Sequence, residues 1–172
     1  MESQIIKKAI SGDSEALTIL IDKYKDIAYN LALSIVKNRE DAKDITQDSF
    51  LKVLENINRF RSDSKFSTWL YKIVYNQSIG FRKKVSHTNS VDYSVIADNS
   101  EEIDNKEDKI QDLYKAINLL ADTDRNVIML FYLAEKSIKE IVQITGLSVS
   151  NIKVILHRAR KKLFEKMDYE NK

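Results

Sequence analysis

The sequence predicts an all-α protein in which a flexible acidic linker joins two small helical domains. The 172-residue chain has no proline and three glycines, so it lacks the residues that most often end helices. Apolar residues recur at three- and four-residue intervals, the period of an amphipathic helix. That period lapses over residues 85–106, where polar residues dominate. We therefore expect domains over residues 1–84 and 109–172 and a linker over residues 85–108.

The first two long helices are predicted by caps and by periodicity. Asp13 is a suitable N-cap for a helix whose apolar positions run from Leu17 to Ile35. Asn38 is a cap for a second helix over about Asp41–Ile57, because acidic residues follow it in the first turn. The face of this second helix that we expect to be buried comprises Ala42, Ile45, Phe50, Val53, Leu54 and Ile57.

The opposite face of the second helix carries a candidate binding site. Its members share helical spacing and are Asp44, Gln47, Asp48, Leu51 and Glu55. Clustered carboxylates could suggest a divalent metal, but no histidine or second acidic helix completes such a site, and we expect no metal there. A solvated surface is the default reading. Docking of another protein is the better functional alternative, because Leu51 is apolar and lies among the acids.

A polar loop and a third helix form the next candidate site. The loop spans residues 58–65, and the helix is expected over about Phe66–Lys84. Aromatic residues alternate with cations along this helix, a pattern that suits single-stranded DNA because rings stack on unpaired bases and cations follow phosphates. The structural alternative is a core helix with a basic end that complements the helix dipole. Trp69 is expected to be core rather than a DNA contact.

The last third of the chain has the pattern of a helix-turn-helix. Apolar positions from Ile110 to Leu120 predict one helix, and Asp122-Thr123-Asp124 is expected to cap the next, which runs through Leu133. Gly146 can adopt the positive φ that a turn needs, and Ser148 can cap a final helix. The residues expected to face inward are Ile138, Ile141, Val142, Ile144, Leu147, Val149, Ile152, Leu156, Ala159 and Leu163.

The outward face of the final helix is expected to fit a major groove of duplex DNA. That face comprises Ser150, Asn151, Lys153, Val154, His157 and Arg158. An ordinary helix pair with a solvated basic face is the alternative. The coincidence of cap, turn, apolar core and cations favours DNA binding.

Charge distribution and composition narrow the classes further. Residues 1–84 carry a net charge of +4, residues 85–124 of −7 and residues 125–172 of +5. Basic ends favour phosphate-rich partners. The chain has no cysteine, which excludes disulfides and thiolate metal sites. It has two histidines, which disfavours a histidine-based catalytic site. We expect no catalytic residue and no cofactor. No long apolar run or cleavable signal is present, which predicts a cytoplasmic protein without membrane insertion.

Two stretches in the first half of the chain closely resemble the conserved second region of bacterial sigma factors. They are DAKDITQDSFLKV at residues 41–53 and FSTWLYKI at residues 66–73, with Phe60-Arg61 between them. The helix-turn-helix with LHRAR at residues 156–160 resembles the fourth region of those proteins. With only these two regions and a short linker, the chain resembles the extracytoplasmic-function group of sigma factors.

The resemblance implies a dissociable subunit that directs RNA polymerase to promoters. Asp44, Gln47, Asp48, Leu51 and Glu55 would dock on the β′ clamp of core RNA polymerase. The fourth region would meet the β flap, and the linker would run toward the RNA exit path. An anti-sigma factor is an expected further partner.

The resemblance also implies two separate contacts with promoter DNA. The melted minus-ten element would be bound by Arg59, Arg61, Lys65, Lys72, Tyr75, Asn76, Arg82 and Lys83. The minus-thirty-five duplex would be bound by Ser150, Asn151, Lys153, Val154, His157 and Arg158.

Three positions depart from the family pattern. Asp122-Thr123-Asp124 stands where a proline commonly begins the helix, and Gly80 stands where Asp or Asn is frequent. Val154-Ile155 replaces a common Ser-Arg pair, so the resemblance implies a more apolar duplex contact with fewer phosphate bonds.

Two other functions fit part of the sequence. A stand-alone helix-turn-helix regulator with an N-terminal sensing or dimerisation domain would bind a symmetric duplex operator without polymerase. It would leave the aromatic and basic segment at residues 66–84 unused. An enzyme acting on nucleic acid would need a metal cluster or a nucleophile–base pair, and the sequence contains neither pattern.

Overall fold

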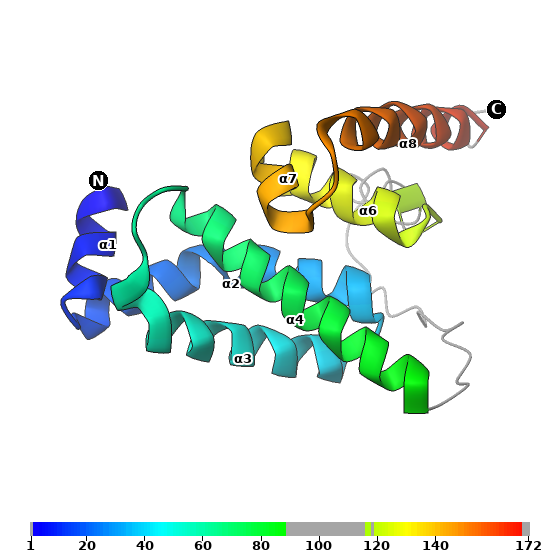
Figure 1. The fold of residues 1–172 in the computed structure, drawn as a ribbon. Helices are drawn as coiled ribbons and strands as arrows, with labels where there is room; N and C mark the ends of the chain where they lie inside the picture. Colours follow the sequence, from blue (N-terminus) through cyan, green and yellow to red (C-terminus); the bar gives the residue numbers. More distant parts are fainter. Residues whose placement is uncertain (1, 89–115, 118, 170–172) are drawn as a thin grey trace, which may run out of the picture. The chain divides into compact units, whose positions relative to one another are not determined.

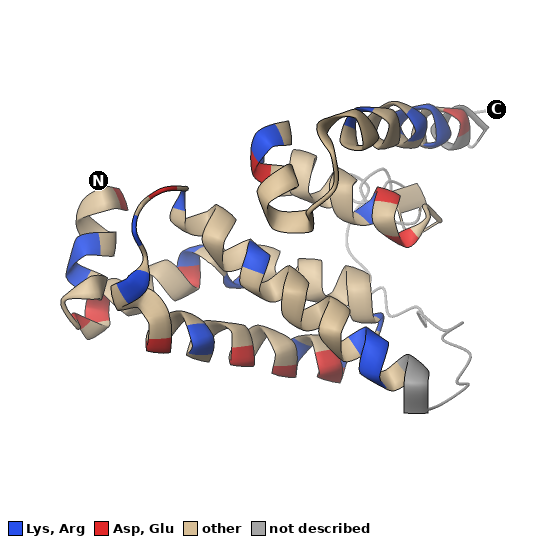
Figure 2. Cartoon of the chain, in the orientation of Figure 1, with Lys and Arg blue, Asp and Glu red and all other residues tan. Residues whose placement is uncertain are grey.

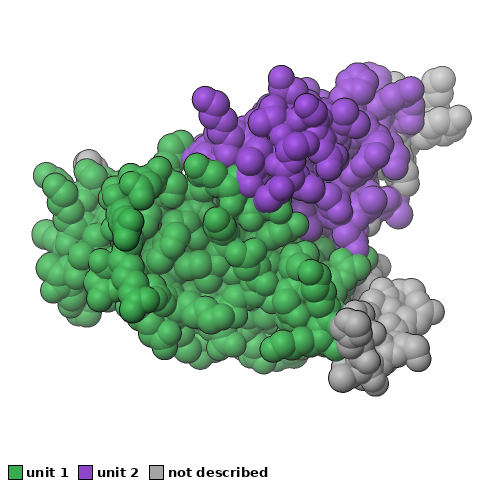
Figure 3. Space-filling model, viewed as in Figure 1, with its two compact units in different colours: residues 1–93, 143–145 green, residues 94–142, 146–172 purple. Residues whose placement is uncertain are grey.

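The computed structural model describes residues 2–88, 116–117 and 119–169 of the chain. Throughout this described part, regular secondary structure is helical and no strand occurs, so the predicted all-α class is confirmed. The described residues fall into two compact units (Figure 3). The first holds residues 2–88 with 143–145, and the second holds the other described residues.

The first unit contains four α-helices and one short 3₁₀ turn. The helices are α1 (Glu2–Ile10), α2 (Ser14–Val36), α3 (Arg39–Asn56) and α4 (Phe66–Thr88). The 3₁₀ turn η1 (Ile57–Arg59) follows α3 directly. α2, α3 and α4 pack against one another in all three pairings, and α1 packs on α2 (Figure 1).

Side-chain caps explain where α2 and α3 begin. The Asp13 carboxylate accepts hydrogen bonds from the backbone N–H groups of Glu15 and Ala16 at 3.0 and 3.1 Å. The Asn38 side chain accepts one from the Asp41 N–H at 3.1 Å. These bonds satisfy N–H groups that have no partner within the helix. Both predicted caps are confirmed, and α2 ends at Lys37 in the left-handed conformation with φ of 59°.

Interlocking apolar side chains from α2, α3 and α4 form the core of the first unit. Leu31, Ile35, Leu70 and Val74 are at most 1% exposed. At about 25 cal/mol per Å², burial of this kind is the main favourable term in folding. Leu54 differs from the expectation, because it is 37% exposed and lies outside this core.

Two features of the first unit were not predicted. α1 was not predicted because it has nine residues, too few to show a clear helical repeat of apolar positions. It is held by the Glu2 carboxylate, which pairs with Lys23 Nζ at 3.1 Å and accepts a hydrogen bond from the Tyr24 hydroxyl. α4 continues to Thr88, four residues beyond its expected end, so it takes in the start of the predicted linker. The rest of that linker lies outside the described residues.

The second unit is built on α6 (Asp122–Ile128), which continues through the π-helical turn η2 (Met129–Leu133). α7 (Ile138–Thr145) and α8 (Val149–Tyr169) follow. α8 packs on α6. Val127, Ile128, Leu130, Ile152 and Ile155 are at most 2% exposed. The predicted helix from Ile110 lies mostly outside the described residues, although Ile117 and Leu120 are buried as expected.

The predicted cap of α6 is wrong. Ala121 is the residue at the N-cap, and no side chain caps the helix there. Asp122 and Asp124 instead lie within the first turn, and Asp124 is buried with 1% exposure. Its carboxylate is used for an ion pair, which accounts for the difference.

No helix in the described ranges combines the length and the apolar character that a membrane crossing requires.

Gly80 provides a test of helix continuity in α4. A Cβ built there meets no atom within 4 Å, and the residue has no positive φ. Gly80→Ala is therefore expected to raise the free energy of unfolding by about 0.5–1 kcal/mol, because alanine loses less backbone entropy in a helix. Chemical denaturation followed by circular dichroism measures the change.

Gly146 is the matched control, because its φ of 76° strains any other residue. Gly146→Ala should lower the free energy of unfolding. A loss of stability in Gly80→Ala would contradict the continuous helix at that point.

Candidate protein and nucleic-acid interfaces

The outward face of α3 forms one continuous stripe of exposed side chains. We call it the acidic stripe, and it consists of Asp44, Gln47, Asp48, Leu51 and Glu55. The structure brings all five together, as the spacing predicted, because the opposite face of α3 is buried. Acidic residues recur along α3 in Figure 2. Leu51 is 49% exposed and Leu54 is 37% exposed, so apolar area lies among the charges.

Several carboxylates lie close together in the first turns of α3, next to the acidic stripe. Burial raises the pKa of the Asp41 carboxyl, and the nearby carboxylates of Asp44 and Glu40 raise it further. Within the described residues no group of three or more His, Asp or Glu side chains is arranged to hold a metal ion. The geometry therefore gives no support to the metal reading of the stripe.

Polar contacts fix α3 against α4. Lys52 Nζ donates to Gln77 Oε1 at 2.8 Å, and Gln77 Nε2 donates to Ser49 Oγ at 3.2 Å. Ser49 is fully buried and also donates to the Ile45 carbonyl at 2.7 Å. These bonds hold the inner side of α3, so its outer stripe is a rigid surface.

An open groove borders the acidic stripe at Gln47. It has a volume of about 300 Å³ and lies between α2 and α3. Its lining comprises Ile21, Lys25, Asp26, Tyr29, Lys43, Thr46, Gln47 and Phe50. The groove adds α2 side chains to the surface that a partner docking on α3 would meet.

A cluster of three aromatic rings closes the loop between η1 and α4. We call Phe60, Phe66 and Trp69 the aromatic clasp. Phe60 lies 5.2 Å from Trp69 and 5.9 Å from Phe66, measured between ring centroids. The clasp joins the first residue of the loop to the first turn of α4. Trp69 is half-buried, so its ring serves the clasp while part of it stays accessible to solvent.

The loop presents cations around this clasp. Arg59, Arg61 and Lys65 are exposed. Ser62 adopts a left-handed conformation with φ of 58°, which lets the short loop reverse direction. The Lys65 carbonyl accepts hydrogen bonds from the N–H groups of Thr68 and Trp69 at 3.0 and 3.2 Å, and so begins α4.

The outer face of α4 continues the polar surface. Lys72, Asn76, Arg82 and Lys83 are exposed, and Tyr75 is half-buried. Burial raises the pKa of the Tyr75 phenol, so the hydroxyl stays protonated and can donate a hydrogen bond. All eight residues predicted to contact melted DNA thus keep solvent-accessible surface.

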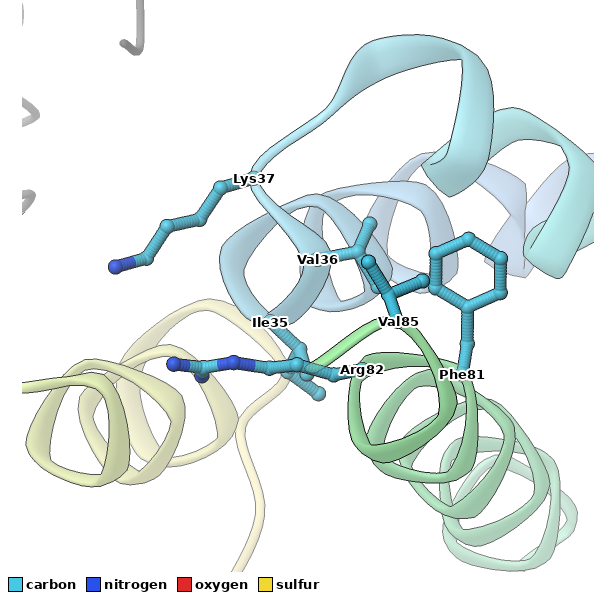
Figure 4. A pocket seen from close by; sticks show the side chains of 6 residues that line it. All are labelled: Ile35, Val36, Lys37, Phe81, Arg82 and Val85. Carbon is cyan, nitrogen blue, oxygen red and sulfur yellow. The ribbon is translucent and has the colours of Figure 1, made fainter. Parts of the chain in front are cut away.

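A small pocket lies between the ends of α2 and α4 (Figure 4). Its volume is about 50 Å³. Apolar side chains line it together with two cations, and the residues are Ile35, Val36, Lys37, Phe81, Arg82 and Val85. The charged ends of Lys37 and Arg82 extend to the same side in Figure 4. The fold therefore adds Lys37 to the cationic end of α4, which no local sequence signal indicated.

The helix-turn-helix is shaped by caps at both of its helices. Ser137 and Glu140 form a capping box at α7 that the sequence reading missed, although Ser-x-x-Glu is its signature. The Ser137 N–H donates to Glu140 at 2.9 Å, and the Glu140 N–H donates to Ser137 Oγ at 3.3 Å. Gly146 ends α7 with φ of 76°, and Ser148 Oγ accepts the Asn151 N–H at 3.2 Å. The predicted turn and second cap are confirmed.

The outward face of α8 exposes every residue predicted for duplex contact. These residues are Ser150, Asn151, Lys153, Val154, His157 and Arg158. Val154 is 58% exposed and stands among polar neighbours. The predicted anchor at Val149 is wrong, because Val149 is 44% exposed. The apolar duplex contact implied for the Val154-Ile155 pair is left to Val154, because Ile155 is 2% exposed and lies one helical turn from Ile152 and Ala159 on the buried face.

The guanidinium of Arg158 donates two hydrogen bonds to the buried carboxylate of Asp124. Its Nε donates to Asp124 Oδ2 at 2.9 Å, and its Nη2 donates to Asp124 Oδ1. The hydrogen bonds that Arg158 donates to Asp124, and then the negative charge of that carboxylate, raise the pKa of Arg158. Arg158 lies on the open face, as predicted, whereas Asp124 does not serve as the predicted helix cap.

A second arginine of α8 packs on aromatic rings. Arg160 Nε donates to the Tyr132 hydroxyl at 2.6 Å, and its guanidinium carbon lies 5.7 Å from the ring centroids of Phe131 and Tyr132. Tyr132 is 49% exposed. This contact ties α8 to η2.

Comparison with known protein families gives two matches in chain order. Residues 20–88 match Sigma-70 region 2, and residues 110–163 match Sigma-70, region 4. Together they take in the acidic stripe, the aromatic clasp, α4 and the helix-turn-helix.

Two curated proteins of Bacillus subtilis strain 168 are similar over nearly the whole chain. The ECF RNA polymerase sigma factor SigW is 34% identical over 92% of this chain and 92% of its own length. The RNA polymerase sigma factor SigV is 32% identical over 91% of this chain and 93% of its own length.

Two solved structures share the fold. The sigma factor RpoE from Bartonella quintana, in complex with the anti-sigma factor NepR, aligns with a TM-score of 0.74 at 23% identity, over 88% of this chain and 96% of that chain. CnrH, in complex with the cytosolic domain of CnrY, aligns with a TM-score of 0.66 at 22% identity, over 96% of each chain.

The capping box at α7 yields a testable prediction. Ser137→Ala should lower the stability of the helix-turn-helix by about 1 kcal/mol, because the Glu140 N–H in the first turn of α7 loses its acceptor, Ser137 Oγ. Hydrogen exchange of the α7 amides would report the loss as faster exchange. Ser150→Ala is the control, because Ser150 is exposed within α8. Equal effects of the two substitutions would contradict the role of the capping box.

Proposed function

This chain belongs to the extracytoplasmic-function group of RNA polymerase sigma factors, and from that membership we propose which of its surfaces bind core polymerase and which bind promoter DNA. A sigma factor binds core RNA polymerase and directs it to promoters. We propose that residues 1–84 bind core polymerase and the minus-ten element, and that residues 109–172 bind the minus-thirty-five element. Residues 85–108 join the two.

The acidic stripe on α3 docks on the β′ clamp of core polymerase. Its support is the combination of exposed Leu51 with carboxylates on a rigid helix. Apolar area supplies affinity for a protein partner, while charges set orientation and association rate. The groove between α2 and α3 offers space beside the stripe for side chains of the clamp.

The loop at residues 59–65 and the outer face of α4 capture the melted minus-ten strand. Exposed cations follow the phosphates, and aromatic or amide groups meet unpaired bases. The residues that we assign to this contact are Arg59, Arg61, Lys65, Lys72, Tyr75, Asn76, Arg82 and Lys83. Binding of the single strand offsets unstacking, which costs about a few kcal/mol per flipped base.

The exposed face of α8 meets the minus-thirty-five duplex in the major groove. The residues that we assign to it are Ser150, Asn151, Lys153, Val154, His157 and Arg158. Val154 suits an apolar contact such as a thymine methyl group, whereas Lys153 suits a phosphate. The second unit also contacts the β flap.

Core polymerase is expected to make the two DNA contacts act together. Each surface alone is small, but a polymerase that fixes their separation makes the second contact effectively intramolecular. The free protein therefore binds promoter DNA poorly. The stand-alone regulator remains the rival function, and no feature of the fold favours it over the sigma factor.

What we propose about the regulation of this chain and its location in the cell is based on its family. Of the similar solved structures named above, one holds the sigma factor RpoE in complex with the anti-sigma factor NepR, and the other holds CnrH in complex with the cytosolic domain of CnrY. We propose an anti-sigma factor for this chain. Sigma factors generally catalyse no reaction, and we propose that this chain has no catalytic residue and no cofactor. We place it in the cytoplasm, where core polymerase and the chromosome are found.

Transcription by purified core polymerase tests the proposed function. Core polymerase of the same bacterium is mixed with this chain and with fragments of the bacterial genome, and RNA 5′ ends are sequenced. Discrete start sites that depend on the chain are expected. Absence of any chain-dependent transcript would refute the function.

Removal of one carboxylate from the acidic stripe tests the docking surface. Asp48→Ala should weaken binding to core polymerase by about tenfold, the usual size for an interface residue of importance. Fluorescence anisotropy of the labelled chain titrated with core polymerase measures it. Glu15→Ala removes the same charge from an exposed position of α2 and should leave the affinity unchanged. An affinity unaffected by Asp48→Ala would place the docking surface elsewhere.

Salt dependence tests the duplex contact. Lys153→Ala should lower the slope of log affinity against log salt by about one, because one phosphate contact is lost. Holoenzyme binding to a promoter fragment at several salt concentrations supplies the slope. Lys7→Ala, which removes a cation from α1, should preserve it. A wild-type slope in Lys153→Ala would argue against this lysine as a phosphate contact.

A further inference from the structure

The carboxylate of Asp124 is buried, and its burial needs an explanation. It lies in the first turn of α6 with 1% of its side chain exposed. Burial of a carboxylate costs several kcal/mol unless a partner satisfies it. The partner is Arg158, whose side chain reaches back from α8 and is 52% exposed. A buried acid in α6 thus supports an exposed arginine on the face proposed to enter DNA.

The two hydrogen bonds occupy one edge of the guanidinium. Nε donates to Oδ2 at 2.9 Å and Nη2 donates to Oδ1. This side-on arrangement leaves the edge formed by Nη1 and Nη2, which carries two parallel N–H donors. In the part of the chain that the structure describes, Arg158 makes no other polar contact. The remaining edge is therefore available to a pair of acceptors outside the protein.

The carboxylate also changes what the arginine is suited to bind. Its negative charge offsets the positive charge of the guanidinium, which weakens attraction to a phosphate. It also restricts a long side chain that otherwise samples many rotamers. An oriented donor pair with little net charge suits directional hydrogen bonds better than long-range attraction. In the major groove the matching acceptor pair is the O6 and N7 edge of guanine.

We propose that Asp124 is a positioning residue that orients Arg158 to read a guanine in the minus-thirty-five duplex. The inference rests on the proposed function and deepens it, because it separates Arg158, which reads a base, from Lys153, which binds a phosphate. It assigns a recognition role to α6, a helix outside the helix-turn-helix itself.

Selection from a randomised promoter library tests the inference. The library is built on a promoter mapped by the transcription experiment above, with its minus-thirty-five positions randomised. Holoenzymes containing wild type, Asp124→Asn, Arg158→Lys or both substitutions select from it. Arg158→Lys keeps the positive charge and removes the fork of donors. It should reduce the preference for guanine at one position by about tenfold and leave the other positions unchanged.

Asp124→Asn should relax the same position, by about threefold to tenfold, because Arg158 loses its orientation. The double variant should be no less selective than Arg158→Lys alone, because the two residues act as one unit. Asp122→Asn is the matched control. It removes a carboxylate from the same turn of α6, one that lies 3.5 Å from Arg125, and it should keep the wild-type preferences.

Each other result overturns the inference. Unchanged preferences in Arg158→Lys would make Arg158 a phosphate contact. Unchanged preferences in Asp124→Asn would make the ion pair a purely structural tie. Thermal unfolding of each variant distinguishes a loss of selectivity from a loss of folding. If Asp124→Asn does not fold, the exposed Arg158→Lys substitution still tests whether Arg158 reads a guanine. A wild-type chain that forms no holoenzyme would refute the proposed function and this inference together, whereas normal wild-type selection with unaltered variants would refute the inference alone.

Discussion

Each surface that we propose for recognition includes the outer stripe of a helix whose inner stripe is buried, and burial of the inner stripes is the interaction on which the rest depends. Ala42, Ile45 and Val53 anchor α3 in the core of the first unit, and the acidic stripe is what that burial leaves outside. Ile152, Ile155 and Ala159 anchor α8 in the same way. A helix rotated by one residue would bury charges and expose its apolar face, so packing selects which side chains face solvent.

Polar contacts then refine surfaces that apolar packing has placed. The pair of Ser49 and Gln77 holds α3 against α4, the aromatic clasp closes the loop before α4, and Asp124 supports Arg158. Such contacts add little to the gross free energy of folding compared with the core. Their contribution is orientation, because a buried hydrogen-bonded group has few alternative geometries.

Features encoded within a few residues could be predicted from the sequence, and features that join distant segments could not. The caps Asp13, Asn38 and Ser148 each bind an N–H group two or three residues away, so local sequence suffices. The exposed faces of α3 and α8 follow mostly from helical period, which fails at Leu54 and Val149, two apolar residues that the structure leaves exposed. Asp124 was assigned to a cap because its partner lies 34 residues further along the chain. The approach of Lys37 to Arg82 and the packing of α1 likewise depend on tertiary structure.

We propose that this sigma factor recognises promoters only as part of a holoenzyme. The direct test of this proposal compares the affinity of the full chain for one mapped promoter fragment in the absence and in the presence of core polymerase. We expect weak, largely sequence-independent binding by the free chain and tight, promoter-specific binding once core polymerase is added. Tight and specific binding of the promoter duplex by the free chain, with no gain from core polymerase, would contradict it.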